Sequence, residues 1–100
     1  MTIYEDSENK GAAVLHQLAD FNDKRVLEVG CGDGRLTWEY AQRASHVTAM
    51  DPNPDRITAA RKSMPSELHN RVQFLVCGIE DYNPPTTQSR FDIAIFGWSL

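Results

Sequence analysis

The chain has 100 residues, is 41% hydrophobic and carries a net charge of −4 at neutral pH. A single domain of this length can form a core, although it buries only about two-thirds of its unfolded surface. The acidic balance and the scattered lysines and arginines argue against nucleic-acid binding, and no apolar stretch approaches the roughly 20 residues that span a bilayer.

The two cysteines give no sign of a disulfide framework or a metal site. Cys31 and Cys77 lie far apart, and neither has metal-ligand spacing to the three histidines. The start of the chain is acidic and polar, unlike a signal peptide. We therefore expect reduced thiols, no bound metal and a cytoplasmic protein that does not contact membranes.

The first half of the chain alternates between helical and extended patterns. Residues 1–24 are predicted to be an N-terminal helical segment, because apolar residues recur at helical spacing over 8–20. The stretch RVLEV (25–29) is β-branched and apolar, as expected for a buried strand. An amphipathic helix is predicted to start near Arg35, and HVTAMD (46–51) is a second strand.

The second half continues the alternation. Asn53 is a good N-cap and Pro54 suits the first turn of a helix that ends near Met64. Strands are then predicted over 71–78 and 91–97, separated by a polar loop rich in proline. Strands that alternate with helices indicate an α/β fold with right-handed crossovers, in this case a Rossmann-like, doubly wound parallel sheet of four strands.

Three glycines follow the first predicted strand at once, in the stretch VGCGDGR. In a sheet of this kind, ligands bind beyond the carboxyl ends of the strands, at the switch point beside the first strand. Gly30, Gly32 and Gly34 would let the backbone turn tightly and let a ligand touch main-chain atoms. The sequence therefore predicts a nucleoside-bearing cofactor on residues 30–34.

The charges around this loop favour a cation over a pyrophosphate. The glycines read G-x-G-x-G, whereas the dinucleotide fingerprint is G-x-G-x-x-G, and Glu28 and Asp33 add negative charge. Asp51 ends the second strand, where a carboxylate can accept hydrogen bonds from ribose hydroxyls. Ile79 and Glu80 follow the third strand and suit the face and the amino group of an adenine. S-adenosylmethionine fits this pattern.

Four stretches together resemble the motifs of class I S-adenosylmethionine-dependent methyltransferases: VLEVGCGDGRLT, VTAMDPNP, VQFLVCGIEDY and FDIAIFGWSL. They cover residues 25–100, the expected cofactor-binding domain. The resemblance implies that each strand end contacts one part of the cofactor. The methionine part would be held by Glu28, Gly30, Cys31, Gly32 and Gly34, the ribose by Asp51, and the adenine by Ile79 and Glu80. Gly97 would lie near the sulfonium.

Some positions depart from the family pattern. Pro52 stands where members often place a bulky apolar residue against the adenine, and Gly78 stands where many have an aspartate. The family's sheet has seven strands, whereas four are predicted here, so the chain is expected to be the N-terminal, cofactor-binding portion of that fold. Residues 91–97 would then form an apolar edge strand, through which the chain is expected to self-associate.

The chemistry that the resemblance implies needs few protein groups. A sulfonium methyl is a strong electrophile, so the enzyme must chiefly bring a nucleophile in line and exclude water. No catalytic residue is assigned; Tyr4 and His16 are candidates without support, and Tyr4 better suits a lid.

The expected acceptor is a small molecule. The stretch NPPT (83–86) resembles a signature of base-modifying methyltransferases, but it precedes the last strand instead of following it. Two other readings remain open: an NAD-dependent oxidoreductase, and a non-catalytic nucleoside-binding or interaction module.

Overall fold

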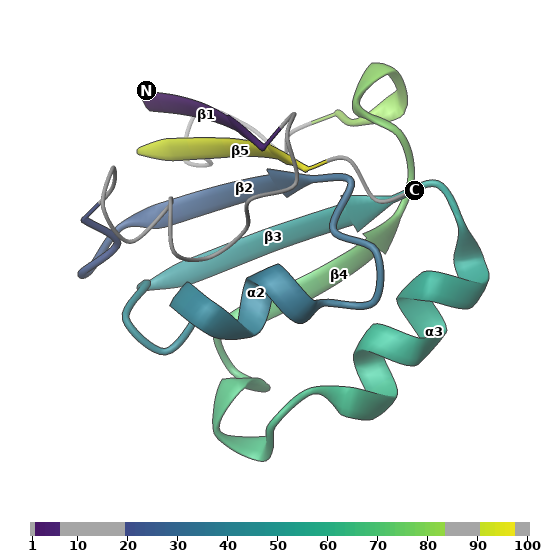
Figure 1. Cartoon of the computed structure of the whole chain (residues 1–100), viewed down its shortest axis with the longest axis horizontal. Helices are drawn as coiled ribbons and strands as arrows, with labels where there is room; N and C mark the ends of the chain where they lie inside the picture. Colours follow the sequence, from purple (N-terminus) through teal and green to yellow (C-terminus); the bar gives the residue numbers. More distant parts are fainter. Residues whose placement is uncertain (1, 7–19, 84–90, 98–100) are drawn as a thin grey trace.

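The computed structural model describes residues 2–6, 20–83 and 91–97, which form a parallel sheet flanked by helices (Figure 1). The sheet has five strands: β1 (Thr2–Asp6), β2 (Arg25–Val29), β3 (His46–Asp51), β4 (Val72–Val76) and β5 (Ile93–Gly97). The described helical segments are α2 (Arg35–Tyr40), α3 (Pro54–Ser63) and the short 3-10 turns η1 (Ser66–Leu68) and η2 (Ile79–Asp81). The prediction of a Rossmann-like α/β fold is confirmed.

Local sequence signals explain where the elements begin and end. The strands β2 and β3 coincide with the two apolar runs from which they were predicted. The Asn53 side chain accepts a hydrogen bond from the backbone N–H of Asp55 at 2.9 Å, and Pro54 occupies the first turn of α3. This cap satisfies one of the free N–H groups of the helix start.

The strand order is β1-β5-β2-β3-β4, and every neighbouring pair is parallel. From β2 the chain adds β3 and β4 on one side, and β5 then lies on the other side of β2. The direction of strand addition therefore reverses between β2 and β5. Such a switch point leaves a crevice at the carboxyl ends of the strands.

The strand β1 corrects two predictions. Residues 2–6 are extended, not helical, and pair with β5 in the register Thr2↔Ile93 to Asp6↔Gly97. The strand β5 thus lies between β1 and β2, and the expected exposed edge at 91–97 is wrong because backbone groups of β1 occupy it. The proposed route to self-association loses its basis. The helix predicted over 8–20 lies outside the described residues.

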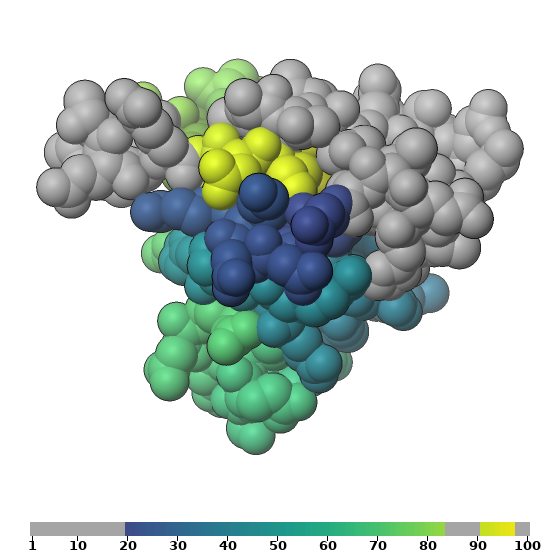
Figure 2. Space-filling view, turned by 90° about the vertical axis from the view of Figure 1, so that its left-hand side faces the viewer, coloured from purple at the N-terminus to yellow at the C-terminus, as the bar shows by residue number. Residues whose placement is uncertain are grey.

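The larger core lies between the sheet and the two helices, which cover the same face (Figure 1). The rings of Phe21 and Tyr40 stack with centroids 4.6 Å apart, and Trp38 meets Phe74 edge-on at 5.7 Å. Figure 2 looks onto the end where the strands begin, and shows the dark blue residues below the yellow strand β5. Phe21, which precedes β2, is therefore part of the packed domain.

The opposite face of the sheet carries a smaller apolar cluster. Leu27, Met50 and Ala94 are buried there, and Tyr82 and Phe91 from the connection between β4 and β5 pack against them. Within the part of the chain that the structure describes, no helix has the length and apolar character needed to cross a membrane.

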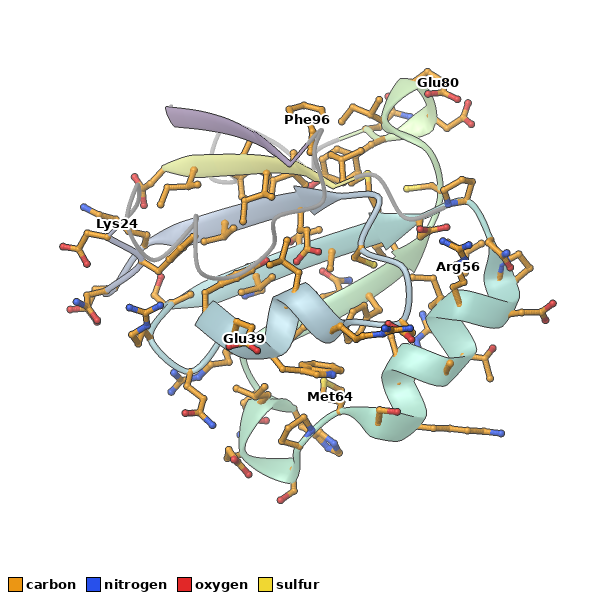
Figure 3. All side chains as sticks on the ribbon, in the orientation of Figure 1. Lys24, Glu39, Arg56, Met64, Glu80 and Phe96 are labelled. Carbon is orange, nitrogen blue, oxygen red and sulfur yellow. The ribbon has the colours of Figure 1, made fainter. Side chains whose placement is uncertain are left out.

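Truncating Phe21 tests its place in the core. Phe21 is fully buried, so we expect Phe21→Ala to lower the free energy of unfolding by about 3 to 5 kcal/mol through lost burial and a residual cavity. Urea denaturation measures the change, and Lys24→Ala, on the exposed side chain labelled in Figure 3, is the matched control. A loss below about 1 kcal/mol for Phe21→Ala would show that the segment before β2 packs loosely.

Candidate functional site

The predicted site residues gather at the carboxyl ends of the strands. Here the glycine loop (30–34) leaves β2, the turn after Asp51 leaves β3, and η2 follows β4 (Figure 1). The end of β5 at Gly97 closes this edge beside the glycine loop. The structure thus brings together segments that are up to 67 positions apart in the chain, as Gly30 and Gly97 are.

Gly30 needs to be a glycine for two reasons. Its φ is +78°, a left-handed conformation that side chains disfavour. A Cβ atom at Gly30 would also overlap the carbonyl oxygen of Gly97, and a Cβ at Gly97 would come within 3.0 Å of the Gly30 oxygen. The ends of β2 and β5 therefore pack directly against each other as bare backbone at the switch point, a contact that we call the backbone cradle.

The N–H groups of the loop are used by the protein itself. The Met50 carbonyl accepts hydrogen bonds from the N–H groups of Gly30 at 2.8 Å and Cys31 at 3.0 Å. The N–H of Gly32 donates to Oδ2 of Asp51 at 3.0 Å. A phosphate cradle would present these donors to the ligand. The loop is therefore fixed to β3, and its bonding does not suit a pyrophosphate.

Asp51 joins two loops from a buried position. Only 4% of its surface is exposed, and its second oxygen, Oδ1, accepts the N–H of Asn53 at 2.9 Å. Asp51 thus holds the loop after β2 and the turn after β3 together at the carboxyl ends of the strands.

Glu28 is tied to the helix that follows the loop. Its Oε1 accepts the hydroxyls of Thr37 at 2.7 Å and Tyr40 at 2.6 Å, and the residue is 1% exposed. Burial raises the pKa of Glu28 to about 7, although both hydrogen bonds act to lower it. Burial and the nearby Glu28 carboxylate also raise the pKa of Tyr40.

This cluster gives Glu28 a structural role beside the predicted one. It links β2 to α2 directly beneath the glycine loop, and neither partner was predicted from the sequence. The available signal was a threonine and a tyrosine spaced i, i+3, which places Thr37 and Tyr40 on one face of a helix.

Cys31 lies in the loop as an inert thiol. Its Sγ donates to the Gly32 carbonyl at 3.6 Å, and burial raises its pKa, helped by the carboxylates of Glu28 and Asp51. A thiol held in its protonated form is a poor nucleophile. Cys31 therefore shapes the loop and does not supply reactive chemistry.

The segment after β4 presents an apolar side chain and a carboxylate. Ile79 is 41% exposed, and among the described large apolar residues Val76, at the end of β4, is also exposed, at 46%. Glu80 is exposed, and Figure 3 shows it on the outer side of η2. Its Oε1 lies 2.9 Å from the place where a Cβ on Gly78 would be. The exposed side chain of Ile79 could therefore cover a flat ring, while Glu80 lies on the outer side of η2.

Other predicted residues lie farther from the loop or outside the described chain. Pro52, at the position where family members often have a bulky apolar residue, is exposed on the turn after β3. Trp98, His16 and the side chain of Tyr4 lie outside the described residues. Among the residues that the structure does describe, no three His, Cys, Asp or Glu side chains form a group that could hold a metal ion.

Comparison with known proteins gives a consistent result. A family profile described as "Methyltransferase domain" matches residues 26–100. The chain is 36% identical over 81 residues to magnesium-protoporphyrin O-methyltransferase of Rhodobacter capsulatus, which covers 80% of this chain and 36% of that protein. It is 35% identical over 75 residues to the mitochondrial ubiquinone biosynthesis O-methyltransferase of Schizosaccharomyces pombe, with 73% and 26% covered.

Solved structures agree with the fold. Precorrin 8W decarboxylase from Methanobacterium thermoautotrophicum matches with a TM-score of 0.64 and 26% identity, over 85% of this chain and 45% of that one. An S-adenosylmethionine dependent methyltransferase from Mesorhizobium loti matches with a TM-score of 0.67 and 21% identity, over 84% and 37%. The chain spans less than half the length of these relatives.

Adding one methyl group to Gly30 tests the backbone cradle. We expect Gly30→Ala to lower the free energy of unfolding by about 2 to 4 kcal/mol, because the positive φ and the overlap with Gly97 both act against it. The control is Gly78→Ala, since Gly78 has a φ of −89° and faces only an exposed side chain. Equal effects of the two substitutions in urea denaturation would contradict the cradle.

The buried carboxyl of Glu28 predicts a pH-dependent stability. Its folded-state pKa, about 7, lies above the ordinary value of 4.5, so the folded state binds the proton more tightly than the unfolded state. The resulting stabilisation, on the order of 3 kcal/mol, is complete below the unfolded pKa and is lost as the pH rises through 7.

Denaturation of the Glu28→Gln variant across this range measures that contribution. We expect wild type to lose stability relative to Glu28→Gln between about pH 4.5 and pH 8, because glutamine keeps an acceptor for Thr37 and Tyr40 but does not titrate. The exposed Glu67→Gln is the control and should follow wild type. Parallel pH profiles for wild type and Glu28→Gln would show that folding does not raise the pKa of Glu28.

Proposed function

This chain belongs to the class I S-adenosylmethionine-dependent methyltransferase family, and we propose that it is the cofactor-binding half of an enzyme that methylates a small molecule. The family's cofactor is S-adenosylmethionine. The observation that carries the proposal is the glycine loop, which packs as bare backbone against Gly97 at the switch point and is fastened to the buried Asp51. The chain covers 36% of one curated relative and 26% of another, which supports the view that it is one part of the enzyme.

We assign the methionine part and the ribose of the cofactor to the loop and its anchor. A cationic ligand suits the glycine loop (30–34) because Glu28 and Asp51 place carboxyl groups next to it, and Cys31 contributes its backbone. Ribose hydroxyls would donate to the Asp51 carboxylate. Gly97 lacks a side chain at the end of β5 and would let the ligand lie over the backbone there.

We assign the adenine to the segment after β4. Ile79 would cover one face of the ring, and Glu80 would accept a hydrogen bond from the exocyclic amino group after a rotation of its exposed side chain. Pro52 would contribute only an edge of the pocket. Burying Ile79 against the ring would contribute about 1 to 2 kcal/mol.

The cofactor, when bound, supplies a methyl group already activated by its sulfonium, so the protein has few tasks in the reaction itself. The described residues bind and orient the cofactor and keep water from the end of β2 and β5. They offer no proton acceptor to which we assign a catalytic role. The buried Glu28 contributes negative charge beneath the loop in proportion to its ionised fraction.

A small-molecule acceptor is supported by the relatives. Two of them are named for magnesium-protoporphyrin and for ubiquinone biosynthesis. We further propose a reducing compartment such as the cytoplasm, because Cys31 and Cys77 are both free thiols. The oxidoreductase alternative is not favoured, since the N–H groups of Gly30, Cys31 and Gly32 already have protein acceptors.

Calorimetry with S-adenosylhomocysteine and with NAD tests the proposal. We expect the chain to bind S-adenosylhomocysteine and to release no heat with NAD. Asp51→Asn should weaken the binding by roughly 10- to 100-fold, since a hydrogen bond to a charged group contributes about 1.5 to 3 kcal/mol.

The matched control is Asp55→Asn, four positions away on the exposed first turn of α3. It should bind S-adenosylhomocysteine as wild type does, and circular dichroism should show that both variants are folded. Heat with NAD alone, or equal binding by Asp51→Asn and wild type, would overturn the proposed site.

A further inference from the structure

A groove lies at the far end of the sheet from the glycine loop. It has a volume of about 270 Å³ and is lined by the first residues of β2 and β3, by the middle of β4 and by residues on either side of the connection to β5. It opens on the face opposite α2 and α3, where Leu75 and Tyr82 join the smaller apolar cluster. Since β2 rises about 3.3 Å per residue, its start at Arg25 is well separated from the loop that follows Val29.

The groove is basic in an otherwise acidic chain. Arg25 and His46 are paired neighbours on β2 and β3, so their side chains project on the same side of the sheet. Among the described residues that line the groove there is no aspartate or glutamate. Asp92 comes just before β5 and lies beside the first residue of β2. Its Oδ2 accepts the backbone N–H of Arg25 at 2.9 Å, and it is not among the lining residues.

One buried donor in this groove lacks an acceptor. The Nε atom of Arg25 is shielded from solvent and has no hydrogen-bond partner among the described residues. A buried N–H of a charged group that remains unpaired costs free energy, so such groups are rare in folded proteins. Arg25 therefore lines the groove with part of its hydrogen-bonding capacity unused, and a ligand acceptor would pair with the guanidinium where it faces the groove.

The other residues that line the groove indicate which kind of hydrogen-bond acceptor a ligand would bring. Thr48, Gln73 and Asn83 bring a hydroxyl and two amides, while Tyr82 and Phe91 add aromatic surface. Guanidinium groups bind carboxylate and phosphate oxygens in pairs of parallel hydrogen bonds, and amides add donors to the same oxygens. The aromatic wall suits the body of an organic molecule.

We propose that this groove binds a small organic anion whose carboxylate or phosphate oxygens pair with the Arg25 guanidinium. The site is separate from the cofactor site, so its occupant is neither the methyl donor nor a group held by the glycine loop. Bound there, the anion also lies beside His46, whose ring is 3.3 Å from the hydroxyl of Thr48.

His46 provides a direct readout of binding. Its pKa is lowered in the free protein by burial and by the charge of Arg25. An anion against Arg25 reverses part of this effect, so the pKa of His46 should rise. NMR titration of the histidine rings at constant ionic strength, with inorganic phosphate and separately with benzoate, measures it against the exposed His69.

The two probes distinguish the two anion types. Tighter binding of benzoate would assign the groove to aromatic carboxylates, and tighter binding of phosphate would assign it to phosphorylated compounds. Either result should saturate and should leave His69 unchanged. Equal movements of His46 and His69, or no movement with either probe, would overturn the proposal.

Two variants and a control locate the effect. Arg25→Gln should weaken binding of the better probe by about tenfold or more through loss of the charged pair. Gln73→Glu, on an exposed position of β4, should also abolish binding and should raise the pKa of His46 without any anion. Lys62→Gln, which removes a positive charge from the exposed side of α3, should bind as wild type does. Wild-type binding by Gln73→Glu would contradict the proposed site.

Discussion

The buried carboxylate of Asp51 determines how the segments at the switch point are arranged. By accepting the N–H groups of Gly32 and Asn53, it joins the connection after β2 to the connection after β3. Two further bonds from the loop to the Met50 carbonyl act in the same direction. The loop therefore leaves β2 on a fixed path, α2 begins where that path ends, and the hydroxyls of α2 reach back to Glu28.

Much of the fold could be predicted because most elements are defined by local signals. Apolar runs bounded by turn residues located β2 and β3, and an N-cap followed by proline located the start of α3 at Pro54. The strand β1 was missed because the helical pattern over 8–20 was taken to describe the whole segment before β2. The first three residues of TIYED nevertheless favour strands. Its pairing with β5 depends on contacts between opposite ends of the chain, which periodicity cannot reveal.

The geometry of the candidate site was predictable where the backbone conformation requires a particular residue type. It was less predictable where side chains from different helices and strands contact each other. The positive φ of Gly30 and the carboxylate at the end of β3 follow from the order of strand, loop and helix. The contacts of Glu28 with Thr37 and Tyr40 depend on the rotation of α2 about its axis, which the sequence does not determine. The basic groove depends on register between strands, since Arg25 and His46 are 21 positions apart.

The internal bonding of the glycine loop also affects the thermodynamics of ligand capture. Main-chain amides that are already engaged in the free protein have little left to rearrange when a molecule arrives. The conformational entropy of this segment is lost during folding, not during association. The affinity for the proposed cofactor would then depend mainly on new contacts and on desolvation, and its binding would proceed without a slow closing step at this loop.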